Sequence, residues 1–192
     1  AFASGDFNGD GLLDLAVLNG VVPDFTGGTK DIGSVTYLSG DTKGLSFIRR
    51  VPVGRQPQNI TSGDYNRDGS WDVVVSNRLS LPDDQDVFGL GDLTYIAGVK
   101  DVGVVEGMRI PGGQNIFWSP NPLITDDFDG DGVLDVAALN TGATSYVTYL
   151  RWNAAHAALG FVAPLDTGGE SQAFAVGDFN NDTLPDLAVT NS

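Results

Sequence analysis

Asp6-Phe-Asn-Gly-Asp-Gly-Leu-Leu-Asp14 is the most informative stretch of this chain, because three further segments match it without gaps. The matching segments are Asp64-Tyr-Asn-Arg-Asp-Gly-Ser-Trp-Asp72, Asp127-Phe-Asp-Gly-Asp-Gly-Val-Leu-Asp135 and Asp178-Phe-Asn-Asn-Asp-Thr-Leu-Pro-Asp186. Their first residues are separated by 58, 63 and 51 residues in a chain of 192. Self-similarity at periods of this size indicates a repeat architecture.

The similarity continues outside the nine-residue segments. Position 2 is always aromatic, the residue four before position 1 is always apolar, and the residue thirteen after position 1 is always Asn. These residues are, in that order, Phe7, Tyr65, Phe128 and Phe179; Phe2, Ile60, Leu123 and Phe174; and Asn19, Asn77, Asn140 and Asn191. An apolar, partly β-branched run such as Asp72-Val-Val-Val75 follows each segment, and such runs favour β-strands. Each segment is therefore predicted to be a loop that joins two strands.

The loops carry oxygen ligands at a spacing that suits a hard cation. Positions 1, 3, 5 and 9 are Asp or Asn, position 6 is Gly in three of the four loops, and the position 7 carbonyl offers a backbone oxygen. Ca²⁺ takes 6–8 such oxygens, whereas Mg²⁺ retains its waters and zinc, copper and iron favour nitrogen or sulfur. The sequence therefore predicts up to four Ca²⁺ sites.

These loops differ from an EF-hand, which ends in a ligating Glu at position 12. Position 12 here is Val17, Val75, Ala138 or Val189, and a strand follows instead of a helix. The alternative is an Asp/Gly-rich turn that binds nothing. However, 13 of the 23 Asp residues occupy the spaced positions, and without a cation they would repel one another strongly.

The stretches between the loops complete a repeating set of four strands, A to D. Strand A is predicted at 1–5, 58–63, 122–126 and 172–177, and strand B at 14–18, 72–76, 135–139 and 186–190. Strand C is predicted at 33–38, 92–97 and 146–151, and strand D at 45–51, 104–110 and 160–164. Units of this size with four strands are typical of β-propeller blades. The expected fold is all-β, with three complete four-stranded antiparallel blades plus half a blade, and we expect an open arc instead of a closed ring.

The string Asp6-Phe-Asn-Gly-Asp-Gly-x-x-Asp-Leu-Ala-Val17 resembles the FG-GAP/VCBS repeat of integrin-α-like calcium-binding β-propellers. The resemblance extends over essentially the whole chain and implies blades at about 1–54, 55–113 and 114–168, with a half blade at 169–192. It also implies that the calcium loops lie between the first two strands of each blade and are structural, and that a complete propeller has seven blades.

Carried onto this chain, the resemblance implies metal ligands at positions 1, 3, 5, 7 (carbonyl) and 9 of every loop. They are Asp6, Asn8, Asp10, Leu12 and Asp14; Asp64, Asn66, Asp68, Ser70 and Asp72; Asp127, Asp129, Asp131, Val133 and Asp135; and Asp178, Asn180, Asp182, Leu184 and Asp186. Two residues depart from the pattern. Thr183 replaces the position 6 Gly, and Arg67 at position 4 of the second loop brings a positive charge near the expected ion.

Composition excludes several functional classes. The net charge of −15 disfavours nucleic acid and anionic membranes as partners, because phosphates would be repelled. The absence of Cys excludes thiol catalysis and disulfides, and the single His156 excludes a multi-His metal centre within this chain. The close Asp pairs are explained by the metal loops, so we expect no catalytic residues and no enzyme activity.

The expected function is a calcium-stabilised extracellular module for binding or adhesion, with a protein or a glycan as ligand. Phe117 and Trp118, between Gly and Pro residues, are the candidate docking pair; the alternative is that they cover a blade edge. Calcium suits an extracellular or cell-surface location, where weak modules bind at ~10⁻⁴–10⁻³ M. Two other functions remain open, a structural subunit of a surface layer or filament and a non-catalytic domain of a secreted carbohydrate-active enzyme. Further blades or a neighbouring subunit are expected to cover the open edge of the half blade.

Overall fold

A computed structural model describes the chain except for residues 21–31, 80–90, 105–106, 112–119, 141–144 and 192. The described residues form antiparallel β-strands joined by turns and bends, which confirms the expected all-β class. No helix long and apolar enough to cross a membrane occurs in this part of the chain.

The described residues form thirteen strands. They are β1 (Phe2–Gly5), β2 (Asp14–Asn19), β3 (Ile32–Asp41), β4 (Gly44–Gly63), β5 (Asp72–Leu79), β6 (Asp92–Ile96), β7 (Gly107–Pro111), β8 (Pro120–Asp126), β9 (Asp135–Asn140), β10 (Tyr146–Asn153), β11 (Ala158–Asp166), β12 (Ser171–Gly177) and β13 (Asp186–Asn191). Every strand predicted from the sequence overlaps one of these elements, and most boundaries agree to within three residues.

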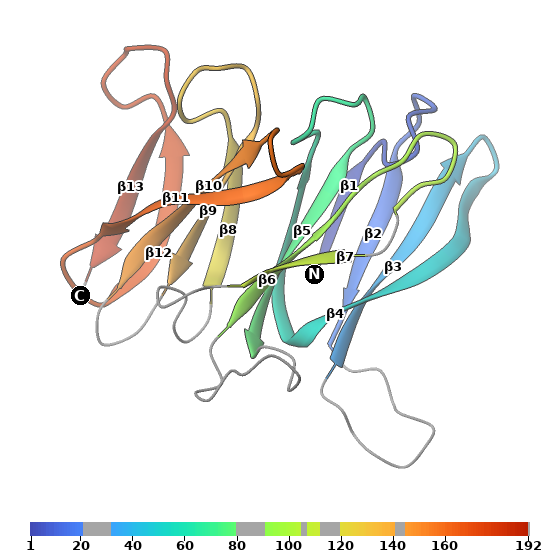
Figure 1. Cartoon of the computed structure of the whole chain (residues 1–192), viewed down its shortest axis with the longest axis horizontal. Coiled ribbons are helices and arrows are strands. Elements are labelled where there is room, and N and C mark those ends of the chain that lie inside the picture. The colour runs from blue at the N-terminus through green and yellow to red at the C-terminus, as the bar shows by residue number, and fades with distance from the viewer. Residues whose placement is uncertain (21–31, 80–90, 105–106, 112–119, 141–144, 192) are drawn as a thin grey trace.

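The strands form three complete four-stranded units and one half unit, as expected for a partial propeller. We name them by their strands: the first unit is β1–β3 with the first part of β4, the second unit is the rest of β4 with β5–β7, the third unit is β8–β11, and the half unit is β12–β13. In the described part of the chain β13 pairs with β12 alone. Figure 1 shows the half unit and the first unit at opposite ends of the row of units, so the described strands form an open arc.

The prediction of two separate strands at 45–51 and 58–63 was wrong in one respect. Both belong to β4, which runs without interruption over 20 residues and pairs with β3 along its first part and with β5 along its second. The chain changes direction within it at Gln56, whose φ of 49° is unusual for a residue other than glycine. The first two units therefore share one strand and form one seven-stranded sheet.

The hydrophobic core lies between successive units. One cluster joins the first and second units through residues such as Ala16, Tyr37 and Val73. A second cluster joins the second and third units, and a third joins the third unit to the half unit around Phe174. Each unit is therefore stabilised mainly by apolar contacts with the units beside it.

The four predicted metal loops lie in a row along one edge of the molecule, the upper edge in Figure 1. They connect β1 to β2, β4 to β5, β8 to β9 and β12 to β13. The turn between β6 and β7 reaches the same edge, because the Asp101 N–H donates to the Asn8 carbonyl at 2.7 Å. This C–D turn therefore lies on the same face as the A–B loops.

Candidate metal centre

Each predicted metal loop closes a pair of antiparallel strands in the same register. The residue before position 1 pairs with the Asp at position 9: Gly5 with Asp14, Gly63 with Asp72, Asp126 with Asp135, and Gly177 with Asp186. Position 9 is thus the first residue of the second strand. The other ligand positions lie in the intervening loop, so the chain returns on itself with its oxygens grouped above the strand ends.

A repeated set of hydrogen bonds shapes the loops. In the first loop the Asp6 carboxylate accepts the N–H groups of Asp10 and Gly11 at 3.0 and 2.7 Å, and Asp10 Oδ1 accepts the Leu12 N–H at 2.8 Å. The second and fourth loops repeat all three bonds. The third loop repeats the bonds to Gly132 and Val133. The acidic side chains therefore position the loop backbone, and their remaining lone pairs are available to a cation.

The loop backbone needs a positive φ at two positions. Position 6 has φ between 76° and 86° in all four loops, and position 4 has φ between 59° and 72°. Glycine adopts these values at little cost, whereas most L-residues are strained by roughly 1–2 kcal/mol. Thr183 at position 6 has φ 76°, so the fourth loop carries backbone strain at the position where its sequence departs from the pattern.

Replacing Thr183 by Gly should relieve this strain. Gly also increases the entropy of the unfolded chain, so we expect a net gain of up to about 1 kcal/mol. Hydrogen exchange of β12–β13 peptides should slow by up to about fivefold. Asn181→Gly is the matched control at position 4, where φ is 62°, because Asn tolerates this region and should gain little. Equal effects of the two variants would contradict a specific strain at Thr183.

Three of the position 9 carboxylates accept hydrogen bonds from tyrosine hydroxyls, which were not predicted from the sequence. The Tyr37 hydroxyl donates to Asp14 Oδ2 at 2.9 Å and the Tyr149 hydroxyl donates to Asp135 Oδ2 at 2.7 Å. Tyr95 makes the corresponding hydrogen bond to Asp72. The sequence does contain a repeated motif that marks these tyrosines. Each lies in a Thr-Tyr-Leu or Thr-Tyr-Ile triplet, at 36–38, 94–96 and 148–150.

The threonine of each triplet explains the repeated Asn thirteen residues after position 1. The side-chain N–H groups of Asn19, Asn77 and Asn140 donate to the hydroxyls of Thr36, Thr94 and Thr148 at 2.8, 2.9 and 2.7 Å. The second and third strands of each complete unit are thus joined twice, once by Asn–Thr and once by Asp–Tyr. Both pairs fix the strand that begins at position 9, and the loop is anchored through it.

Burial raises the pKa of two position 9 carboxyls. The pKa of Asp72 is raised to about 7 and that of Asp135 to about 6, in both cases chiefly by desolvation. Hydrogen bonds from backbone N–H groups and from tyrosine oppose these shifts, and neighbouring loop carboxylates add to them. The metal-free Asp72 carboxyl therefore retains its proton up to about neutral pH and Asp135 up to about pH 6, and a cation would have to displace these protons.

This competition predicts a pH-dependent stabilisation by metal. Unfolded Asp titrates near 3.9, so the metal-free fold binds these protons more tightly than the unfolded chain does. Its stability should therefore fall as pH rises from about 4 to 7. A bound cation favours the ionised carboxylates, so the difference in Tm between Ca²⁺-saturated and metal-free protein should grow from pH 5 to pH 8. Thermal scans at each pH test this, and a constant difference would contradict it.

The third loop contains a cluster of acidic oxygens that could hold a metal ion. One carboxylate oxygen from each of Asp127, Asp129 and Asp135 lies within 4.8 Å of the others. Asp127 Oδ1 is buried and accepts no hydrogen bond, although buried carboxylate oxygens are normally paired. Its counterparts in the other three loops accept the position 5 N–H. An oxygen-seeking cation fits this donor set, and it would satisfy the unpaired oxygen.

Two arginines contact the third loop. Arg151 on β10 forms an ion pair with Asp129, which offsets the additional carboxylate that this loop carries in place of Asn. Arg67, at position 4 of the second loop, donates instead to the Asp131 and Gly132 carbonyls at 2.8 and 3.2 Å. Its guanidinium therefore links two neighbouring loops.

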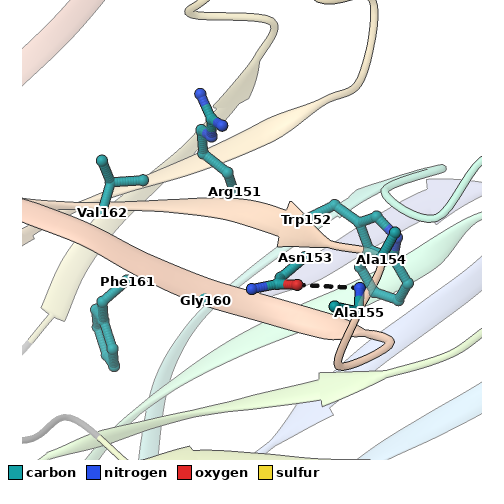
Figure 2. A pocket seen from close by; sticks show the side chains of 8 residues that line it. All are labelled: Arg151, Trp152, Asn153, Ala154, Ala155, Gly160, Phe161 and Val162. Atoms are coloured by element: carbon teal, nitrogen blue, oxygen red, sulfur yellow. Dashed lines mark hydrogen bonds between the residues drawn. The ribbon is translucent and has the colours of Figure 1, made fainter.

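A hollow lies beside this loop, at the hairpin of β10 and β11. It is lined by Arg151, Trp152, Asn153, Ala154, Ala155, Gly160, Phe161 and Val162. Figure 2 shows Arg151 and Val162 on one side of the hairpin and Phe161 on the other. Arg151 is paired with Asp129, and the Asn153 side chain accepts the Ala155 N–H at 3.0 Å. The Trp152 ring packs at a tilt against Tyr95, with the ring centroids 5.7 Å apart. These groups are engaged within the protein, so we assign the hollow no ligand.

The candidate docking pair Phe117 and Trp118 lies outside the described residues. Five acidic residues of the segments that join strands B and C also lie outside them: Asp24, Asp31, Asp83, Asp84 and Asp86. That surface remains a prediction from the sequence.

The comparisons with known proteins support the fold and the repeat. Residues 127–189 match the FG-GAP-like repeat, which confirms the resemblance inferred from the loops. The crystal structure of the exotype rhamnogalacturonan lyase YesX matches 97% of this chain with a TM-score of 0.63 and 16% sequence identity. The chain spans 37% of the length of that lyase, and identity at this level shows a shared fold alone. No curated protein sequence matches the chain.

Proposed function

We propose that the chain is a calcium-stabilised, non-catalytic propeller module of an extracellular or cell-surface protein. The observation that carries the proposal is the unpaired, buried Oδ1 of Asp127 within the carboxylate cluster of the third loop. The other three loops also have an Asp at position 1 and share the hydrogen-bond pattern of the third loop. We therefore extend the proposal to all four loops.

Calcium is the cation that the donor set favours. Every predicted ligand is an oxygen from a carboxylate, an amide or a backbone carbonyl, and Ca²⁺ accepts such irregular all-oxygen sets more readily than Mg²⁺ does. The residues that would hold it are those at positions 1, 3, 5, 7 and 9 of each loop. A bound ion would neutralise their mutual repulsion and fix each pair of strands at its loop. Four ions would change the formal net charge from −15 to −7.

Direct binding tests the metal assignment. Isothermal titration of metal-free protein with Ca²⁺ should give up to four sites, with Mg²⁺ binding more weakly. Asp127→Asn should weaken one site, whereas Asp166→Asn, at an exposed Asp outside the loops, should leave the titration unchanged. Absence of Ca²⁺ binding at millimolar concentration would refute the assignment.

The module is proposed to act by binding a protein or a glycan, with Phe117 and Trp118 as the docking pair. Aromatic rings supply large contact areas for sugar faces and protein side chains. Ligand binding should be lost in Trp118→Ala while the Tm in Ca²⁺ stays unchanged. Trp71→Ala is unsuitable as a control because Trp71 packs between units, so Phe161→Ala on exposed β11 serves instead.

A second candidate is the non-catalytic domain of a carbohydrate-active enzyme, favoured by the structural match to a rhamnogalacturonan lyase. Affinity electrophoresis in gels containing rhamnogalacturonan distinguishes the two functions. Retarded migration would favour the polysaccharide-associated module. Unretarded migration together with capture of a protein ligand would favour adhesion.

A further inference from the structure

Arg67 adopts a backbone conformation that disfavours its residue type. It occupies position 4 of the second loop with φ 59°, whereas the first and third loops have Gly at this position, Gly9 and Gly130. A left-handed conformation strains the backbone of a residue with a Cβ, and Gly avoids that strain. The contacts of the Arg67 side chain are therefore the feature that distinguishes this position from its glycine counterparts.

The Arg67 guanidinium contacts the backbone of the third loop. Its Nη2 group donates to the Asp131 carbonyl at 2.8 Å, and its Nε group donates to the Gly132 carbonyl at 3.2 Å. Gly132 leaves room for this contact, because a Cβ at this residue would lie 2.4 Å from Arg67 Nη2. Among the described residues nothing lies within 4 Å of the same point at Gly11 and Gly69, the equivalent residues of the first and second loops. The absence of a side chain at position 6 of the third loop therefore serves both the turn and the contact with Arg67.

The two carbonyls that Arg67 contacts lie beside predicted metal ligands. Asp131 is the ligand at position 5, and the Gly132 carbonyl belongs to the peptide group that precedes Val133, the ligand at position 7. The N–H groups of this segment are also bonded, since Gly132 donates to Asp127 Oδ2 at 2.8 Å and Val133 donates to Asp131 Oδ1 at 2.7 Å. Arg67 therefore restrains the carbonyls of a segment whose N–H groups are restrained by ligand carboxylates.

The backbone of Arg67 itself lies between two predicted ligands of the second loop. Asn66 is at position 3 and Asp68 is at position 5. The Asp68 N–H donates to Asp64 Oδ1 at 3.1 Å and to Asn66 Oδ1 at 2.8 Å. A cation held by these oxygens would fix the residues on both sides of Arg67. With its backbone fixed, the guanidinium would restrain the third loop at a smaller entropic cost.

We propose that Arg67 couples the second and third calcium sites, so that Ca²⁺ binding at one strengthens binding at the other. This coupling rests on the proposed function, because it requires both loops to bind Ca²⁺. Once the second loop is ordered, less conformational entropy is lost when the third loop binds. Linkage makes the effect reciprocal. Repulsion between two bound cations acts in the opposite sense, so the sign of the coupling distinguishes the two effects.

Amide NMR spectra recorded during a Ca²⁺ titration test the proposal. The N–H groups of Gly11, Gly69 and Gly132 each donate to the position 1 Asp of their own loop, so each signal reports one site. Asp68→Ala removes a ligand of the second site. It should raise the Ca²⁺ concentration at the midpoint of the Gly132 shift by about fivefold, which is at the lower end of typical couplings. In an Arg67→Gly background the same change should leave this midpoint unaltered, because the bridge is absent.

Asp10→Ala is the matched control, because Asp10 is the position 5 residue of the first loop and does not flank Arg67. It should leave the Gly132 midpoint unchanged. Asp10, Arg67 and Asp68 are all exposed, so these variants are expected to fold, and the signals of the buried strand β9 verify this in the same spectra.

Two kinds of failure are distinguishable in this experiment. If Gly132 responds to Ca²⁺ but Asp68→Ala leaves its midpoint unchanged or lowers it, the coupling is overturned and the calcium sites stand. The same conclusion follows if the midpoint rises equally in the Arg67→Gly background. If none of the three glycine signals responds to Ca²⁺, the calcium sites are refuted and the coupling with them.

Discussion

Removal of calcium is expected to lower the thermal midpoint of this protein by 10 °C or more. One site at 100 times its Kd contributes about 2.7 kcal/mol, so two such sites contribute roughly 5 kcal/mol. For a domain of this size each kcal/mol corresponds to about 2–4 °C, which gives a shift of roughly 10–20 °C. The physical cause is the repulsion among the thirteen loop Asp residues, which a bound cation offsets.

Differential scanning calorimetry of chelator-treated protein, before and after addition of Ca²⁺ or Mg²⁺, measures this effect. The midpoint should recover with Ca²⁺ and recover less with Mg²⁺. High salt is the control for general screening, since it should restore only part of the loss. An unchanged midpoint after verified metal removal would exclude a structural role for the metal.

Asp72→Ala should destabilise the protein with or without metal, by several kcal/mol. The Asp72 carboxylate is fully buried and accepts the N–H groups of Tyr65 and Gly98 at 3.1 and 2.9 Å as well as the Tyr95 hydroxyl. Its removal leaves three donors without this partner, and each buried unsatisfied donor costs about 1–3 kcal/mol.

Asp68→Ala is the matched variant in the same loop, because Asp68 is exposed and supports mainly the loop itself. Urea denaturation of both variants in Ca²⁺ and in chelator separates the two roles. Asp68→Ala should lose stability chiefly in Ca²⁺, whereas Asp72→Ala should lose it in both buffers. A metal-free Asp72→Ala protein as stable as its parent would show that the buried hydrogen bonds contribute little.

The sequence predicted the loops and nearly all strands because their signals are local. Loop ligands, turn glycines and the following β-branched run all lie within about fifteen residues of position 1. The Asp–Tyr and Asn–Thr pairs were missed because they depend on strand pairing across a connection of variable length. Tyr37 and Tyr95 each follow their Asp by 23 residues, but Tyr149 follows Asp135 by 14.

The continuity of β4 was missed for a different reason. Pro52 and Pro57, with Gly54 between them, are typical of a break between strands. The structure accommodates them with irregular registers near Pro52 and Pro57 and the positive φ at Gln56. The ion pair between Arg151 and Asp129 could not be predicted either, because a single Arg in a strand sequence does not indicate which carboxylate it will contact.

The uninterrupted course of β4 has a consequence for how the molecule opens. A strand that hydrogen-bonds to β3 along one part and to β5 along the other cannot leave one unit without disturbing the other. The first two units are therefore expected to unfold as one cooperative block, with similar opening free energies across their seven-stranded sheet. Among the described strands, β12 and β13 pair only with each other, so this hairpin is expected to be among the least stable parts of the structure. Local opening is expected to begin in this hairpin. Opening that reaches β4 would unfold the first and second units together, because β4 pairs with strands of both.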